Sequence, residues 1–168
     1  MPAFIIKFAK QLCFFPAFPL ILAWADDAQN PADLWPTPEL GPQQVVKYQL
    51  SVLQHNDEPS PDAGIEKAFR FASPANQRSV GPIDHFKVIV HSPAYAPLLN
   101  AKEAVVLGIK LLSDQAWVLA RVVSTSDAGV FYLFILSKQT EDKVANCWMT
   151  DGVIGFDQPD DSQPKSTI

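Results

Sequence analysis

The sequence is poor in the residues that build metal centres and nucleic-acid surfaces. It has 2 cysteines and 3 histidines among 168 residues, too few for a closed zinc site at any familiar spacing. Lysine and arginine number 13 against 18 acidic residues, and the net charge of −5 excludes the basic surface that nucleic acid needs. The sequence has no phosphate-cradling glycine loop, Gly-x-Ser-x-Gly elbow or Walker-type motif. We therefore expect no metal, no cofactor and no nucleic-acid partner.

Apolar runs long enough to cross a membrane are also missing. The first 25 residues hold two lysines, no acidic residue and a short apolar run that is interrupted by two prolines. The run is shorter than the roughly 20 residues of a membrane helix, and it ends in Ala23-Trp24-Ala25, the spacing that signal peptidase reads. The sequence therefore predicts a signal peptide over residues 1–25 and an exported protein, periplasmic or secreted. We expect no membrane span after cleavage.

The rest of the chain is apolar enough to form one folded domain. Hydrophobic residues make up 48% of the sequence and charged residues 18%. We expect residues 26–40 to form a proline-rich spacer, in which Trp35 is the one residue able to dock on the domain. The domain itself is expected over residues 41–156, and residues 157–168 predict a disordered tail.

Helical patterns come first in this domain and strand patterns second. Three helices are expected to start at Gly41-Pro42, Ser60-Pro61 and Gly81-Pro82, because proline is tolerated in a first helical turn, and Ser73-Pro74 is expected to end the second one. Alternating apolar residues predict strands over 103–112, 116–124, 130–137 and about 146–154. The order predicts an α+β fold, with three N-terminal helices packed on one face of a curved, mainly antiparallel four-stranded sheet.

The first hairpin predicts one apolar face and one mixed face. The apolar side, which should meet the helices, consists of Leu107, Ile109, Leu111, Val118, Ala120 and Val122. The opposite side holds Lys110, Trp117, Leu119 and Arg121 and is expected to continue to Tyr132 and Phe134. Aromatic residues and arginine are typical of interfaces, so Lys110, Trp117, Arg121 and Tyr132 are candidate ligand- or partner-binding residues. Ordinary solvation of the lysine and arginine tips over apolar stems explains Lys110 and Arg121 equally well.

Candidates for catalysis are sparse. Asp84, His85 and Tyr95 could supply an acid or base, but nothing in the sequence brings them together, and solvated helix residues are the better interpretation. Cys147 has no activating histidine near it in sequence and is expected to be a half-buried strand cysteine that acts as a small hydrophobe.

The densest acidic cluster comprises Asp57, Glu58, Asp62 and Glu66. It could form a cation or ligand site, although it lacks the alternating oxygen ligands and the turn glycine of a calcium loop. The favoured interpretation is a turn between two helices, in which Asp57 binds turn amides and Asp62 interacts with a helix N-terminus.

Several of these segments resemble an uncharacterised family, the domain of unknown function 4864. The resemblance rests on Asn56-Asp57-Glu58-Pro59, on Pro61-Asp62-Ala63-Gly64-Ile65-Glu66, on Phe69-Arg70-Phe71-Ala72, on Ser92-Pro93-Ala94-Tyr95 and on Cys147-Trp148-Met149-Thr150. It covers about residues 43–153 and implies a cone-like α+β fold similar to nuclear transport factor two and the SnoaL-like proteins. It implies no reaction, because that fold serves enzymes and binding modules alike.

Three functions remain open at this point. The first is an exported, non-catalytic module that binds a partner or a small apolar ligand and forms a dimer or joins an envelope protein. The alternative is a small cone-type hydrolase or isomerase with an Asp or His base, which would require Asp84 or His85 in a cavity beside another polar group. The third is a structural envelope protein tethered through the Trp35 spacer.

Overall fold

The computed structural model describes residues 33–157. The predicted signal peptide over residues 1–25 lies outside the described residues, as does almost all of the predicted tail. Among the described residues, no helix combines the length and the apolar character that crossing a membrane requires.

Four helices precede a four-stranded antiparallel sheet, so the predicted α+β class is confirmed. In chain order the elements are α1 (Pro42–Gln54), α2 (Ala63–Phe69), α3 (Pro74–Val80), α4 (Ile83–Val90), η1 (Ala96–Leu98), β1 (Glu103–Leu112), β2 (Gln115–Val123), β3 (Gly129–Lys138), η2 (Asp142–Val144) and β4 (Trp148–Asp157). The strand order β1-β2-β3-β4 is a meander. The sheet is open, with β1 and β4 at its edges.

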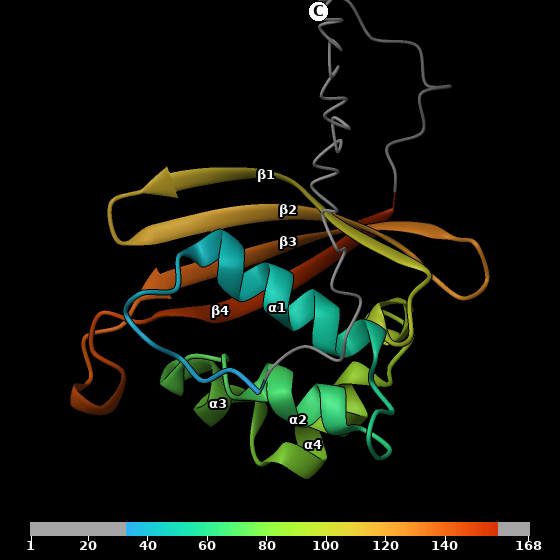
Figure 1. Cartoon of the computed structure of the whole chain (residues 1–168), viewed down its shortest axis with the longest axis horizontal. Helices are drawn as coiled ribbons and strands as arrows, with labels where there is room; N and C mark the ends of the chain where they lie inside the picture. The colour runs from blue at the N-terminus through green and yellow to red at the C-terminus, as the bar shows by residue number, and fades with distance from the viewer. Residues whose placement is uncertain (1–32, 158–168) are drawn as a thin grey trace, which may run out of the picture.

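All four helices lie on one side of the sheet (Figure 1), with α1 against the strands, α3 in contact with β4, and α2 and α4 farther away. The apolar stripe of α1 is buried as its spacing predicts, and Val45, Val46 and Val52 are at most 1% exposed. We call the side that the helices cover the inner face of the sheet and the opposite side the outer face.

The described chain has one more helix in front of the sheet than the sequence predicts. Ser73-Pro74 does not merely end a helix, as expected, because it also starts α3. Ser73 Oγ accepts a hydrogen bond from the Asn76 backbone N–H at 3.2 Å, and Pro74 occupies the first turn. The preceding helix, α2, starts at Ala63, slightly later than Ser60-Pro61 predicts.

α1 and α2 approach so closely that only glycine fits between them. A Cβ on Gly64 would lie 2.1 Å from the carbonyl oxygen of Val52 and 2.7 Å from the Cα of Asn56, and both obstacles are backbone atoms. The Gly64 backbone N–H also donates to the Asn56 carbonyl oxygen at 2.8 Å. The glycine in the most distinctive motif of the family resemblance is therefore a packing requirement.

The inner face is apolar along β2 as predicted, but the prediction for β3 is wrong. Val118 and Ala120 are fully buried under the helices. The register pairs Val118 with Phe134 and Ala120 with Tyr132, so these two aromatic residues lie on the inner face and are at most 2% exposed. A shift of one residue in the assumed register exchanges the two faces of a strand, which explains the error.

β1 departs from the prediction in another way. Leu107, Ile109 and Leu111 were expected to meet the helices, yet they are 52%, 44% and 59% exposed. Ile109 and Leu111 do pair with the inner-face residues of β2. The helices reach only the start of this edge strand, where Ala104 and Val106 pack on the core.

Candidate functional site

A cavity of about 200 Å³ lies between the helices and the sheet. Side chains from all four helices, from the η1 region and from β3 and β4 line it. The apolar part of the lining includes Leu53, Ala68, Phe86, Val90, Leu98 and Phe134. An apolar cavity of about 150 Å³ is large enough for benzene, so this space suits a ligand of about one ring.

The polar side chains that line the cavity are bonded to the protein itself. The Gln49 amide accepts from Thr150 Oγ1 at 2.7 Å and donates to the Ala68 carbonyl oxygen at 3.1 Å. Asn76 Nδ2 donates to the Thr150 carbonyl oxygen at 3.1 Å, and Tyr95 Oη donates to that of Val153 at 3.0 Å. A ligand would therefore meet mainly carbon, because these bonds hold the polar groups against the walls.

Charged side chains are missing from the cavity wall within the part of the chain that the structure describes. The lining residues Val80, Phe86 and Ile89 are half-buried, whereas Leu98 and Phe134 at the sheet side are buried. Gly152 and Val153 of β4 are half-buried too. The cavity therefore opens near α3, α4 and β4 and is closed at Leu98 and Phe134. An apolar chamber with one open side can admit a neutral ligand and gives no charge to fix an ionic one.

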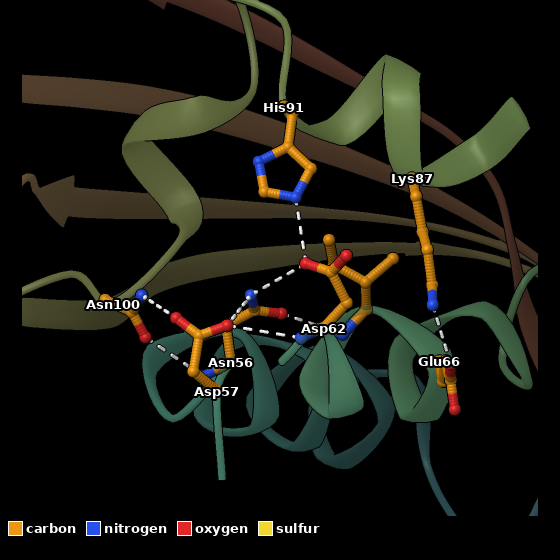
Figure 2. A network of polar contacts seen from close by, with 8 residues as sticks. Asn56, Asp57, Asp62, Glu66, Lys87, His91 and Asn100 are labelled. Atoms are coloured by element: carbon orange, nitrogen blue, oxygen red, sulfur yellow. Dashed lines mark hydrogen bonds and ion pairs between the residues drawn. The ribbon is translucent and has the colours of Figure 1, made fainter. Parts of the chain in front are cut away.

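One ion pair and one histidine–carboxylate hydrogen bond hold α4, one wall of the cavity, against α2 (Figure 2). Lys87 Nζ lies 2.7 Å from Glu66 Oε1, and His91 Nε2 lies 2.8 Å from Asp62 Oδ1. The carboxylate of Glu66 raises the pKa of Lys87 above its usual value. Both contacts are partly exposed, so each contributes modestly to stability, but together they fix the position of α4 over the cavity.

Asp57 and Asp62 of the acidic cluster belong to a hydrogen-bonded network between α1, α2 and the segment before β1 (Figure 2). Asp57 accepts from the Asp62 backbone N–H, as predicted, but the Asp62 side chain makes no capping hydrogen bond to α2. The Asn56 side chain accepts from the Ile65 backbone N–H at 3.1 Å and donates to Asp57 and Asp62 at 2.9 and 3.2 Å. Asn100 Nδ2 donates to Asp57 Oδ2 at 2.7 Å. Within the described range, no group of His, Cys, Asp and Glu side chains could hold a metal ion. The cluster therefore joins structural elements.

Hydrogen bonds lower the pKa values of both aspartates in this network. The Asn100 amide and the Asp62 backbone N–H hold the pKa of Asp57 below its usual range. Partial burial pushes the pKa of Asp62 upward, but hydrogen bonds from His91 and Asn56 outweigh it and leave that pKa lowered. Both groups are therefore carboxylates at neutral pH and accept hydrogen bonds from the surrounding N–H groups.

The structure separates the three weak catalytic candidates. Asp84 and His85 are exposed in the first turn of α4, and His85 Nδ1 lies 2.5 Å from the Val80 carbonyl oxygen. Neither residue lines the cavity, whereas Tyr95 does. The cavity thus contains one of the three and no partner with the charge of a general base.

Three of the four candidate partner-binding residues lie on the outer face. Trp117 is 40% exposed, and Lys110 Nζ lies 5.6 Å from the centroid of its ring. Arg121 NH1 lies 3.8 Å from Glu103 Oε2. Tyr132, the fourth candidate, does not lie on the outer face as expected, because it is fully buried and donates from Oη to the Ala94 carbonyl oxygen at 3.0 Å.

The outer face continues across β3 and β4 with apolar side chains that the sequence analysis did not assign to it. Phe131 stacks on Phe156 with ring centroids 5.9 Å apart, and Ile154 is 53% exposed. Leu133 pairs with both Leu119 and Ile154 across its neighbouring strands. The result is an apolar surface that none of the four helices covers.

Trp35 docks on the domain, as the sequence allowed. The guanidinium of Arg70 lies 4.4 Å from the centroid of the Trp35 ring and also pairs with Asp33. The Leu34 backbone N–H donates to Tyr48 Oη at 3.2 Å. Residues 33–35 therefore lie against α1 and the end of α2.

Cys147 is 3% exposed, and burial raises the pKa of its thiol. A raised pKa keeps the sulfur protonated, and the thiol is a far weaker nucleophile than the thiolate. Cys147 is therefore an unreactive buried side chain, although it lies just before β4 rather than in the strand and is fully rather than half buried.

Sequence reasoning missed the cavity residues Gln49, Asn76 and Ala68. Gln49 carried a signal, since it is a polar residue four positions after Val45 and so falls on the apolar stripe of α1. A buried amide at that position needs internal partners, and Thr150 and Ala68 supply them.

The fold and the cavity define a small α+β domain with an apolar chamber and an uncovered sheet face. The family model of the domain of unknown function DUF4864 matches residues 39–162, and the chain belongs to this family. No curated protein and no solved structure matches the chain.

Proposed function

We propose that the protein is an exported, non-catalytic binding module whose cavity holds a small apolar ligand. The observation that carries this proposal is the roughly 200 Å³ chamber with carbon walls, at which Gln49, Asn76 and Tyr95 are already bonded to the protein. Burying a neutral ring there gains hydrophobic free energy without stripping water from a charge.

The alternative, a hydrolase or isomerase, lacks its acid–base machinery in this chamber. A base must come within hydrogen-bond reach of the substrate. Asp84 and His85 lie outside the lining, and the Tyr95 hydroxyl donates to a backbone carbonyl. The binding function therefore fits the described residues better.

Filling the cavity tests the ligand proposal. Ala68→Leu places extra carbon in the chamber, and Ala75→Leu makes the same change on the exposed side of α3. With benzene and indole as probes, the melting temperature of the wild type and of Ala75→Leu should rise, because a ligand of the native state stabilises it. Ala68→Leu should not respond. Equal responses from all three proteins, or none from any, would refute the proposal.

Native mass spectrometry of protein purified gently from its own host tests ligand and export together. We expect a chain that begins at Asp26 and carries an extra mass of a compound of about one ring. A chain that retains residues 1–25 would contradict export. A chain without extra mass, whose melting temperature also does not rise with benzene or indole, would contradict ligand binding.

A second candidate function, protein binding, is favoured by the uncovered outer face with Trp117 and Arg121. Interfaces are enriched in aromatic residues and arginine, and exposed apolar surface of this extent commonly marks a binding site. A photo-crosslinking residue at Leu119 should capture a defined protein in the host, whereas the same residue at Val88, which is 68% exposed on α4, should not. Equal products from both positions would indicate non-specific contact.

A further inference from the structure

β1 is an edge strand, and many of its exposed side chains are apolar. Of its ten residues, five are large, apolar and at least 37% exposed: Val105, Leu107, Ile109, Leu111 and Leu112. Natural edge strands are normally covered, shortened or interrupted by charge, because their free N–H and C=O groups pair readily with another strand. Glu103 and Lys110 are the two charged residues of β1, and they lie near its ends.

A bulge gives β1 an approximate internal symmetry. The register shifts between Val106 and Gly108, so Leu107 is an extra residue relative to β2. Glu103 and Lys110 are an odd number of positions apart and would lie on opposite faces of a regular strand. Because of the bulge, both lie on the outer face, opposite Val123 and Trp117 of β2.

We propose that two copies of this chain pair antiparallel through their β1 edges, with the two-fold axis between Val106 and Leu107. This register places Glu103 of each copy directly opposite Lys110 of the other on the outer face. Opposite charges that face each other across strands stabilise the pair, and the two-fold axis makes the contact twice.

The same register brings an exposed side chain to a matching depression. Ile109 of one copy would lie opposite Ala104 of the other on the inner face. Ala104 lines a groove between β1 and α1, with Leu50 and Ser51 of the helix on its other side. A small residue facing a large one leaves room for the isoleucine, which is 44% exposed in the single chain. The occupant of the groove is thus a side chain of the second copy.

The dimer would have one eight-stranded sheet, four strands from each copy. The two outer faces would then form a continuous apolar surface, which enlarges the protein-binding face of the proposed function. The edge contact is smaller than a standard interface of about 800 Å² per partner, so we expect a Kd of about 1–100 µM. The cavity lies at β3 and β4, away from this edge, so its ligand binding should be independent of the dimer.

Charge exchange across the edge tests this register. In sedimentation velocity over a concentration series, wild-type protein as the host makes it should dimerise. Glu103→Lys alone and Lys110→Glu alone should each weaken the dimer at least 10-fold, because like charges then face each other twice. A mixture of the two single variants should dimerise again, since each heterodimer contains two complementary pairs. Lys143→Glu in η2 makes the same charge change away from the edge and should have no effect.

Three results would overturn the proposal. They are a monomeric wild type at 100 µM, a dimer that both single variants keep, or single variants that fail to rescue each other although their melting temperatures equal that of the wild type. A dimer insensitive to charge would place self-association on the outer face, and Trp117→Gln would then abolish it. The rise in melting temperature with benzene or indole, measured in the same variants, tests ligand binding by the cavity independently of dimerisation.

Discussion

The two ends of the helical layer are built differently. At the junction of α1 and α2, a glycine allows backbone contact and a buried asparagine joins three segments. Between α4 and the sheet there is an apolar chamber, which residues of α3 also line. The α1–α2 junction is close-packed, with no room for an added Cβ at Gly64, whereas the region beside α4 contains an unfilled cavity.

This difference separates stability from function within one small domain. Close packing and satisfied polar networks fix a single native arrangement, and both features occur at the α1–α2 junction. A binding chamber requires the opposite, because unfilled apolar volume lowers stability. Among the described residues, this apolar chamber lies beside α4, which is held to α2 by two surface contacts, Lys87 to Glu66 and His91 to Asp62. We therefore expect substitutions at the two ends to differ in size.

The largest effect is expected for Gly64→Ala. The new methyl would overlap the backbone of α1, which cannot move without displacing the helix, and we expect a loss of at least about 3 kcal/mol in the free energy of unfolding. Gly108→Ala, where nothing lies within 4 Å of the added Cβ, should change it by less than about 0.5 kcal/mol. Urea unfolding followed by circular dichroism measures both, and similar values would contradict the close approach.

A side-chain amide at each end, buried at Asn56 and half-buried at Asn76, gives the next comparison. Asn56→Ala leaves the Ile65 N–H and two carboxylates without their partner, and we expect a loss of about 2.5 kcal/mol. Asn76→Ala removes one half-buried hydrogen bond to Thr150 and should lose about 1 kcal/mol. The same urea titration distinguishes the two. A larger loss for Asn76→Ala would mean that the polar contacts at the cavity end stabilise the domain more than those at the α1–α2 junction, contrary to our proposal.

Much of this architecture follows from local sequence rules. Alternating apolar residues predicted β1 with the bounds that the structure shows, and Gly41-Pro42 marked the start of α1. In the turn between α1 and α2, Asp57 accepts from a turn amide as predicted. The Asp62 side chain does not cap α2, however, and the Asn56 side chain accepts from the Ile65 N–H instead. Even the missed helix α3 obeys the rule that placed α1, because Ser73-Pro74 caps and starts it.

The features that failed depend on contacts between distant segments. The face on which Tyr132 lies is set by its pairing with Ala120, and that register is decided by the turn between β2 and β3. The bulge in β1 and the exposure of Ile109 depend on where α1 ends above the sheet. The cavity depends on the distance between α4 and β4, which no periodicity encodes.

Truncating a core valine at each end tests the packing contrast. Val52 lies in the filled end and is 1% exposed, whereas Val90 lines the cavity and is 6% exposed. Val52→Ala should lower the free energy of unfolding by about 2 kcal/mol, and Val90→Ala by about 1 kcal/mol, because a residue beside a void has fewer contacts to lose. Differential scanning calorimetry of both variants checks the difference. Equal losses in the free energy of unfolding would contradict the packing contrast and would mean that the cavity beside Val90 is filled in solution.

The smallest effect concerns acid pH at the junction. The pKa of Asp57 is lowered by hydrogen bonds from Asn100 and from the Asp62 backbone N–H. A carboxyl group with a lower pKa in the folded state contributes stability above its usual pKa of about 4, and that contribution is lost as the pH falls through the folded-state value. Because Asp57 is exposed, solvent limits its contribution to about 0.5 kcal/mol.

Asp57→Asn should therefore show a smaller decline in unfolding free energy than the wild type between pH 5 and about pH 2. Asp114→Asn, an exposed change in the turn between β1 and β2, should keep the wild-type decline. Urea titrations at several pH values measure the slope. If Asp57→Asn and Asp114→Asn behave alike, the asparagine contacts of Asp57 do not favour its ionised form. The decline in unfolding free energy at acid pH would then come from another group, and the contact between Asp62 and His91, which links α2 to α4, would be the next one to test.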